Sequence, residues 1–320
     1  MKIVVLDSYA LNPGDLDWSH LKALGECTFY DRTATSDEAE IVKRIGDATV
    51  VLTNKTPISE NVLNKVPTLK YIGVLATGYD VVDVEAANKA GIVVTNIPTY
   101  GTDAVAQFTF ALLLEITSQV GLHSELVHAG KWSSNPDFTF WAKPLIELKD
   151  KTIGIVGFGR IAQAVAKMAH AFSMNVIFYN HRPKDHADWL KQVSLDDLFN
   201  QADIISLHVP QTPETTHLID KNALAKMRDG VIIINTSRGK LLNDVDVAQG
   251  LNSGKILAAG VDVAPQEPIA ADSPLLTAKN CFITPHIAWA PKEARARLLD
   301  IAVKNIQAFN DGKPQNTVNK

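Results

Sequence analysis

The 320-residue sequence has little cysteine and no long hydrophobic run. Its two cysteines, Cys27 and Cys281, lie far apart and match no disulfide framework, zinc spacing or Cys-x-x-Cys redox motif. The apolar stretch at the N-terminus is broken by Asp7 and is shorter than a signal peptide, and no run reaches membrane-spanning length. We therefore expect a cytoplasmic protein with reduced thiols.

The sequence also has no excess of charge of one sign. It contains 31 Lys and Arg residues against 35 Asp and Glu residues, and the basic residues are scattered. We therefore expect neither nucleic acid nor a membrane as a partner. A hydrophobic content of 46% over this length is enough for a substantial core, and two domains are more natural than one.

Short apolar runs alternate with helical segments along the chain, which predicts α/β domains with doubly wound parallel sheets. We expect one domain at residues 1–98 plus 290–320 and another at 99–289. The strands expected in the first domain are Lys2–Leu6, Thr28–Tyr30, Thr49–Thr53, Leu69–Val74 and Ile92–Thr95. Those expected in the second are Thr152–Val156, Asn175–Tyr179, Ile204–Val209, Val231–Asn235, Ala258–Val261 and Cys281–Ile283.

Two segments between these strands suggest interfaces. Thr102–Ser118 predicts a helix that is apolar on nearly every face, so more than one neighbour must bury it. We expect this helix at a domain or subunit interface. The aromatic segment Gly130–Leu145 is expected to be irregular and to form an interface arm.

The strand Thr152–Val156 runs directly into Gly-x-Gly-x-x-Ala, which opens a helix. Gly157 permits the tight turn, Gly159 leaves no Cβ between the chain and a pyrophosphate, and Ala162 allows close helix packing. The first N–H groups of the helix favour phosphate. In this strand-turn-helix context the motif predicts a dinucleotide site.

The second strand of this domain ends at Asn180-His181-Arg182, where an NAD-binding domain usually places an acidic residue. No carboxylate there repels a 2′-phosphate, and Arg182 or Lys184 could pair with one. This pattern favours NADPH and leaves NADH open. A solvated basic loop is the alternative interpretation.

Three ionisable residues follow three successive strands of the second domain, namely Arg238, Glu267 and His286. Parallel strands end at one sheet edge, where ligands bind. The guanidinium of Arg238 suits a substrate carboxylate, and a histidine such as His286 exchanges protons near neutral pH. Glu267 beside the imidazole would orient it. The set predicts hydride transfer between a nicotinamide and a 2-hydroxy or 2-oxo acid, and no metal is expected.

Several motifs together resemble the D-isomer-specific 2-hydroxyacid dehydrogenase family. They are Gly157-Phe158-Gly159-Arg160-Ile161-Ala162, Leu207-His208-Val209-Pro210, Asn235-Thr236-Ser237-Arg238-Gly239, Val261-Asp262-Val263 and Thr284-Pro285-His286-Ile287-Ala288-Trp289. The resemblance implies a Rossmann-type nucleotide domain, a flavodoxin-like substrate domain, an Arg/Glu/His catalytic set and a homodimer. Within the family, the segments Thr53–Thr56 and His286–Ala290 look most like glycerate dehydrogenases, also called hydroxypyruvate reductases.

The same resemblance assigns further binding residues. It implies that substrate contacts Asn54, Ala76, Thr77, Gly78, Arg238 and Trp289. It implies cofactor contacts at Thr102, Gly157, Gly159, Arg160, Ile161, Asn180, His181, Arg182, Val209, Pro210, Thr215, Thr236, Ser237, Asp262 and His286. Asp262 would hold the nicotinamide carboxamide, and a cap at the strand end is the alternative.

Two interpretations of the function remain open at this point. The first is an NAD(P)-dependent enzyme that interconverts a small D-2-hydroxy acid and its 2-oxo acid, with hydroxypyruvate or glyoxylate favoured over other 2-oxo acids. The second is a cofactor-sensing, corepressor-like binding protein. The intact Arg238, Glu267 and His286 favour the enzyme.

Overall fold

A computed structural model describes residues 1–319 and divides the chain into two compact units. Unit 1 comprises Met1–Gly101 and the segment from Trp289 onward, and unit 2 comprises Thr102–Ala288. These limits lie close to the boundaries expected at residues 98 and 290. Unit 2 is therefore continuous in sequence, whereas unit 1 is built from both ends of the chain.

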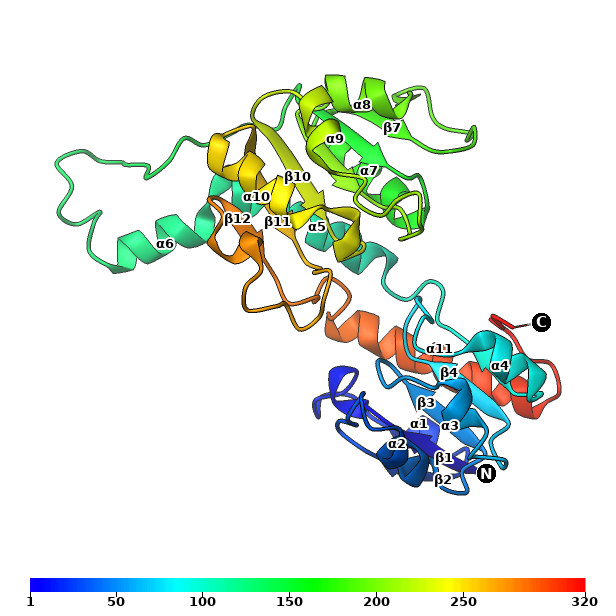
Figure 1. Cartoon of the computed structure of the whole chain (residues 1–320). Coiled ribbons are helices and arrows are strands. Elements are labelled where there is room, and N and C mark those ends of the chain that lie inside the picture. Colours follow the sequence, from blue (N-terminus) through cyan, green and yellow to red (C-terminus); the bar gives the residue numbers. More distant parts are fainter. Residues whose placement is uncertain (320) are drawn as a thin grey trace. The chain divides into compact units, whose positions relative to one another are not determined.

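Unit 1 is built on a parallel five-stranded sheet in the order β2-β1-β3-β4-β5, which is the flavodoxin-like order (Figure 1). Its strands are β1 (Lys2–Val5), β2 (Glu26–Phe29), β3 (Val50–Thr53), β4 (Tyr71–Val74) and β5 (Val93–Thr95). Its helices are α1 (Ser19–Lys22), α2 (Glu38–Ile45), α3 (Glu60–Leu63), α4 (Val84–Lys89) and α11 (Lys292–Asn310).

Helices cover both faces of this sheet because its strands are apolar on both sides. Ile72 and Val74 of β4 share a buried cluster with residues of α2, α3 and α4. Tyr71 points to the other face, as successive strand residues do, and its ring lies 5.0 Å from that of Phe309 in α11. The strands of the first domain were therefore predictable from their apolar runs.

Unit 2 contains a parallel seven-stranded sheet in the order β12-β11-β10-β9-β6-β7-β8, with the strand order of a Rossmann fold. Its strands are β6 (Thr152–Val156), β7 (Asn175–Tyr179), β8 (Leu190–Gln192), β9 (Ile204–Leu207), β10 (Val231–Asn235), β11 (Ile256–Val261) and β12 (Cys281–Ile283). The edge strand β8 was not expected, because its three residues carry only one buried apolar side chain.

Two buried clusters fill the two faces of the larger sheet. One joins the sheet to α8 (Leu195–Gln201), α9 (Lys221–Lys226) and α10 (Asp244–Ser253). The other joins it to α5 (Thr102–Ser118) and α7 (Arg160–Ala171). The unit is thus a three-layer α/β sandwich, and the fold class expected from the sequence is confirmed.

The apolar helix α5 is a core helix of unit 2. It packs against α7, and a Cβ at Gly260 of β11 would lie 3.1 Å from Leu112 of α5. Eight of its residues are buried within the unit. That the helix also lies at a domain or subunit interface stays a prediction. The composition reflects a helix enclosed by sheet and helix together.

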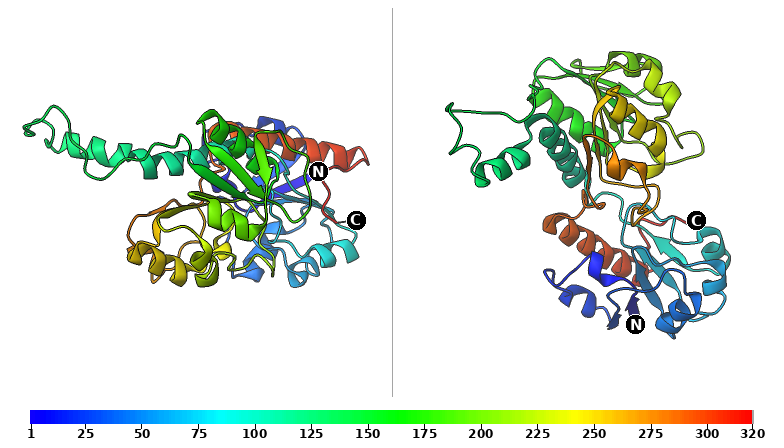
Figure 2. Two further views of the ribbon diagram at one scale, coloured as in Figure 1. Left: turned by 90° about the horizontal axis from the view of Figure 1, so that it is seen from above. Right: turned by 60° about the vertical axis from the view of Figure 1, so that its left-hand side comes forward.

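Six of the eleven exposed large apolar residues described in unit 2 lie on a projecting arm, residues 119–145 (Figures 1 and 2). It begins with α6 (Val120–His128), which was not predicted and has no buried residue, and continues as an irregular segment. Phe138 is 89% exposed and Trp141 is 64% exposed. The arm returns to its base where Ile146 N donates to Thr117 O.

Within residues 1–319, no single helix has both the length and the apolar character needed to cross a membrane. The bent pair α5 and α6 meets these criteria jointly, by length and composition only.

Candidate active site

The dinucleotide loop requires glycine at its first position for two reasons. Gly157 directly follows β6 and has a φ of +87°, in the left-handed region. A Cβ there would lie 2.6 Å from His208 O and 2.7 Å from Val209 Cγ1. The loop after β6 therefore packs directly against the segment after β9, which contains two of the expected cofactor residues.

The N-terminus of α7 is open beside this loop. Gly159 is the N-cap residue and supplies no side-chain cap, and nothing lies within 4 Å of the position of a Cβ on it. Ala162 is fully buried, as close packing of the helix on the sheet requires. Free N–H groups at the start of a helix, with open space before them, fit the pyrophosphate of a dinucleotide.

A hollow of about 270 Å³ adjoins Gly159, and the loop after β7 lines it. Its lining residues are Phe158, Gly159, Asn180, His181, Arg182, Pro183 and Lys184. Gln192 of β8 fixes this loop, because its Nε2 donates to Asn180 O and Arg182 O at 3.1 Å each. Its Oε1 accepts from Lys184 N. Sequence analysis missed Gln192 because it missed the strand that contains it.

The strands that precede the three expected catalytic residues are neighbours. β10, β11 and β12 lie side by side and parallel, so their carboxyl ends share one sheet edge. His286 Nδ1 lies 2.7 Å from Glu267 Oε2, and Glu267 Oε1 accepts from Ala264 N. Both side chains are about 30% exposed, at 29% and 32%. The structure thus pairs an imidazole with a carboxylate that orients it.

Arg238 lies in a turn that its neighbours Asn235 and Gly239 shape. Buried Asn235 donates from Nδ2 to Arg238 O at 2.9 Å and accepts from Ser237 N at 3.0 Å. At Gly239 a Cβ would lie only 1.9 Å from the backbone of Ala264. Only glycine allows this approach, which places the Arg238 turn directly against the loop that leads to Glu267.

Asp262 fixes the backbone that follows His286. It is 1% exposed, and its carboxylate accepts from Thr284 Oγ1 at 2.6 Å, Ile287 N at 2.9 Å and Ala288 N at 2.8 Å. Burial raises the pKa of Asp262, and these three donors oppose that shift. The hydrogen bonds are those of a strand-end cap, which was the alternative considered for this residue. They hold His286, whose φ is +56°.

The other expected cofactor residues of unit 2 lie on α5, on α7 and on the loops after β9 and β10. Thr236 Oγ1 is 3.1 Å from Thr109 Oγ1 of α5, and Ser237 Oγ donates to Leu207 O. Thr215 Oγ1 donates to Pro210 O at 2.7 Å, which closes the loop after β9. The remaining members are Thr102 at the start of α5, Arg160 and Ile161 at the start of α7, and Val209 after β9.

The expected substrate residues of unit 1 follow β3 and β4, which are neighbours in the sheet. Asn54 is buried, and its Nδ2 donates to Leu75 O at 3.2 Å. Ala76 O accepts from Ile97 N, and Thr77 Oγ1 donates to Ile97 O at 2.7 Å. Gly78 completes this loop and is half-buried. The two loops are therefore joined through Asn54.

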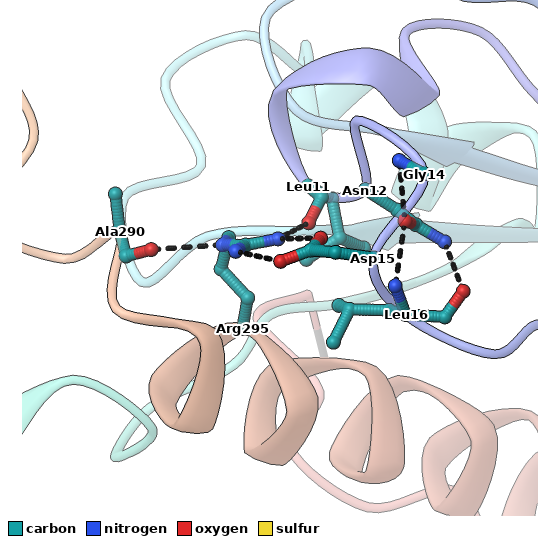
Figure 3. Close-up of polar contacts among 7 residues, drawn as sticks. All are labelled: Leu11, Asn12, Gly14, Asp15, Leu16, Ala290 and Arg295. Atoms are coloured by element: carbon teal, nitrogen blue, oxygen red, sulfur yellow. Dashed lines mark hydrogen bonds and ion pairs between the residues drawn. The ribbon is translucent and has the colours of Figure 1, made fainter.

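Trp289 lies just before α11, and its ring packs edge-on against Tyr100 with the centroids 6.4 Å apart. The start of this helix is anchored by Arg295 (Figure 3). The guanidinium of Arg295 donates to both carboxylate oxygens of Asp15 at 2.7 Å each and to Leu11 O, and its Nε donates to Ala290 O. This bidentate pair raises the pKa of Arg295 and lowers that of Asp15.

Unit 2 combines a Rossmann-type sheet, a glycine turn that fits a pyrophosphate and a His/Glu pair at the same strand ends. This combination defines a nicotinamide-dependent dehydrogenase. More particularly, the chain belongs to the D-isomer specific 2-hydroxyacid dehydrogenase family. The NAD-binding domain of that family matches residues 110–288, more than half of the chain. The protein is therefore an oxidoreductase, and the resemblance inferred from the motifs is confirmed.

Two relatives match over nearly their whole length. The hydroxypyruvate reductase of Blautia hydrogenotrophica is 56% identical over 322 residues, covering 100% of both chains. The glycerate dehydrogenase of Methylorubrum extorquens is 36% identical over 319 residues, covering 99% of this chain and 98% of the relative.

Two solved structures contain a cofactor. An acyclic imino acid reductase in complex with NADPH and D-Arg is 30% identical with a TM-score of 0.85, covering 99% of this chain and 100% of that one. The D-lactate dehydrogenase of Aquifex aeolicus, complexed with NAD and lactic acid, is 30% identical with a TM-score of 0.80, covering 98% and 96%. This chain is thus similar to enzymes that bind either nicotinamide cofactor.

Proposed function

We propose that the protein reduces a small 2-oxo acid to the D-2-hydroxy acid, with hydroxypyruvate or glyoxylate as its main substrate. The observation that carries the proposal is the 2.7 Å contact between His286 and Glu267 at the carboxyl edge of the Rossmann sheet. The full-length similarity to a hydroxypyruvate reductase, at 56% identity, supports the choice of substrate.

The roles of the three residues in unit 2 follow from their chemistry. Arg238 binds the substrate carboxylate through two parallel N–H donors. Protonated His286 donates its Nε2 proton to the carbonyl oxygen, because Nδ1 is engaged by Glu267. Glu267 holds the imidazole in that orientation through its contact with Nδ1. The cofactor, when bound, supplies the hydride for the carbonyl carbon. In the oxidative direction His286 accepts the proton.

In unit 1 we assign substrate contacts to Asn54, to the loop of Ala76, Thr77 and Gly78, and to Trp289. Backbone N–H groups of the loop offer donors that suit a carboxylate. The hydrogen bonds between Asn54 and Leu75 O and between Thr77 and Ile97 O support this assignment, because they hold the loop in one conformation.

For the cofactor we propose that NADPH is accepted and that NADH is not excluded. The hollow beside Gly159 is lined by His181, Arg182 and Lys184, which are able to carry positive charge. A guanidinium pairs well with a 2′-phosphate. The NADPH complex of one structural relative supports this choice, and the NAD complex of another leaves NADH open.

We also propose a cytoplasmic homodimer. The thiols of Cys27 and Cys281 are free, and burial raises the pKa of each, which suits a reducing compartment. The exposed aromatic residues of the arm are the surface that we assign to the second copy. Neither nucleic acid nor a membrane is proposed as a partner.

The test is a set of initial rates with hydroxypyruvate, glyoxylate, pyruvate and a bulky 2-oxo acid, each with NADH and with NADPH. We expect the fastest turnover with hydroxypyruvate or glyoxylate. His286→Gln should reduce kcat by about 10²–10⁴-fold, because general acid catalysis contributes that much, and should bind cofactor normally. His20→Gln, at an exposed position of unit 1, is the matched control and should keep full activity.

The same experiment separates the enzyme from the binding protein. Tight cofactor binding with no turnover of any of the four acids would favour the corepressor-like interpretation. Near-normal turnover by His286→Gln would remove this residue as the proton donor.

A further inference from the structure

A carboxylate outside the catalytic set collects four hydrogen bonds at the carboxyl edge of the smaller sheet. Asp7 follows β1, and its Oδ1 accepts from Asn54 N at 2.7 Å. Its Oδ2 accepts from Lys55 N at 2.6 Å, Thr56 N at 2.8 Å and Thr56 Oγ1 at 3.0 Å. All three successive N–H groups of the loop after β3 thus point to one side chain.

This arrangement comes from the sheet and not from a local turn. β1 and β3 are adjacent and parallel, so residues just past their carboxyl ends meet although they are far apart in sequence. A run of successive N–H groups on one side of a loop is an anion-binding concavity. In this protein the anion is part of the chain, and the loop conformation depends on it.

The loop is also fixed from its other sides. Thr53 Oγ1 donates to Thr56 O at 2.8 Å, which closes the loop on itself. The side chain of Asn54 reaches Leu75 O, at the start of the Ala76–Gly78 loop. Asp7 therefore holds the backbone of the residue that joins the two loops assigned to the substrate.

We infer that Asp7 is a positioning residue for substrate binding, acting through the backbone of Asn54, Lys55 and Thr56. The inference rests on the proposed function, because that function assigns Asn54 to the substrate. Asp7 forms no bond to the reacting atoms in this scheme. Its carboxylate fixes the loop so that Asn54 and the Ala76–Gly78 loop present their polar groups in one arrangement.

The first variant to measure is Asp7→Asn, in the full-length enzyme. An amide has one acceptor oxygen, and its NH₂ group would face the loop N–H groups, so it cannot accept all four bonds. We expect KM for the 2-oxo acid to rise about 10-fold or more and kcat to change less than about 3-fold, since misplaced binding groups weaken positioning. KM for the cofactor should stay unchanged. Amide hydrogen exchange should accelerate at residues 54–56.

Asp7→Glu and Asp37→Ala complete the experiment. Asp7→Glu keeps the charge and should restore part of the substrate affinity. Asp37 caps α2 in the same unit by accepting from Glu40 N, so Asp37→Ala is a control for general destabilisation and should leave KM unchanged.

Unchanged substrate KM in Asp7→Asn, with faster exchange at residues 54–56, would overturn the inference and leave the proposed function intact. An equal rise of KM in Asp37→Ala would overturn it too, because the effect would then be general. Failure of the proposed function is distinguishable, since the wild-type enzyme would then reduce none of the 2-oxo acids.

Discussion

Several polar side chains that follow strand ends in this protein form hydrogen bonds that fix the backbone of neighbouring segments. Asp262 holds the segment after His286, and Asn235 holds the turn of Arg238. Each of these residues is buried and supports a segment to which we assign a catalytic role. The geometry of the catalytic groups therefore depends on buried polar neighbours, whose unpaired atoms would cost about 1–3 kcal/mol each.

His208, another polar residue at a strand end, makes a testable contribution to stability. It follows β9, its Nε2 lies 2.8 Å from Ser206 Oγ, and burial lowers its pKa to about 4. An unfolded histidine titrates near pH 6.5, so between pH 6.5 and 4 the unfolded chain binds a proton that the folded chain does not. The free energy of unfolding should therefore fall as the pH is lowered through this window.

At pH 4.5 this titration lowers the free energy of unfolding of the wild type by roughly 2 kcal/mol. We expect His208→Gln to lose this decrease. Glutamine keeps a group able to bond Ser206 and does not titrate. Urea unfolding at pH 7, 5.5 and 4.5 measures the effect. The matched control is His20→Gln, at an exposed position, and its free energy of unfolding should depend on pH as that of the wild type does. If the free energy of unfolding of His208→Gln showed the same pH dependence as the wild type, His208 would not be held in its neutral form in the native state.

Among the elements, the short strand β8 fixes the loop to which we assign the choice of cofactor. Gln192, its last residue, bonds Asn180 O, Arg182 O and Lys184 N, and so sets the loop of the hollow. The selectivity proposed for Arg182 therefore depends on a side chain that does not itself line the hollow.

Substitutions in this element test that dependence. Arg182→Ala should raise KM for NADPH about 10-fold more than KM for NADH, since one charge-assisted hydrogen bond contributes about 1.5–3 kcal/mol. Gln192→Ala should shift the same ratio in the same direction, by a smaller factor. Lys191→Ala, on the exposed side of β8, is the control and should not change it. If Arg182→Ala raised KM for NADPH and for NADH equally, Arg182 would not contact the 2′-phosphate.

The elements also show what sequence could and could not predict. Most strands of the two sheets are apolar runs, and burial on both faces makes such runs recognisable, as in β3, β4, β9 and β10. The edge strand β2 is only half-buried, and its observed bounds differ from the expected Thr28–Tyr30. Arg238, Glu267 and His286 were found because each follows an apolar strand. β8 was missed because only Leu190 of its three residues is buried. The role of Asp7 was missed because sheet pairing, not sequence spacing, brings it to Asn54.

For the molecule as a whole, the arm is the surface to which we assign the proposed dimer contact. Large side chains such as Phe138 and Trp141 are rarely exposed this far in a monomeric protein, and they lie on one projecting segment. Trp132 Nε1 donates to Phe138 O at 2.9 Å, which gives the irregular part of the arm a defined local structure. Such a surface suits a second copy of the chain.

We expect the wild-type protein to sediment as a dimer and the double variant Phe138→Glu/Trp141→Glu as a monomer at micromolar concentration. Two buried charges without partners at an interface should cost several kcal/mol of association free energy. Val245→Glu, an exposed apolar position on α10, is the control and should remain dimeric. A wild-type monomer in analytical ultracentrifugation would contradict the proposal.

The division of the chain also has a consequence during its synthesis. Unit 2 is one uninterrupted segment, so it is able to fold as soon as Ala288 has left the ribosome. Unit 1 has to wait, because α11 packs on its sheet through Phe309 and Val318 N donates to Val94 O at the edge of that sheet. Unit 1, whose first strands are made first, is thus completed last, and its sheet lacks the cover of α11 until that helix has been made. Early chain release should leave a nascent chain with a folded nucleotide domain and an unprotected sheet, which is the kind of surface that chaperones bind.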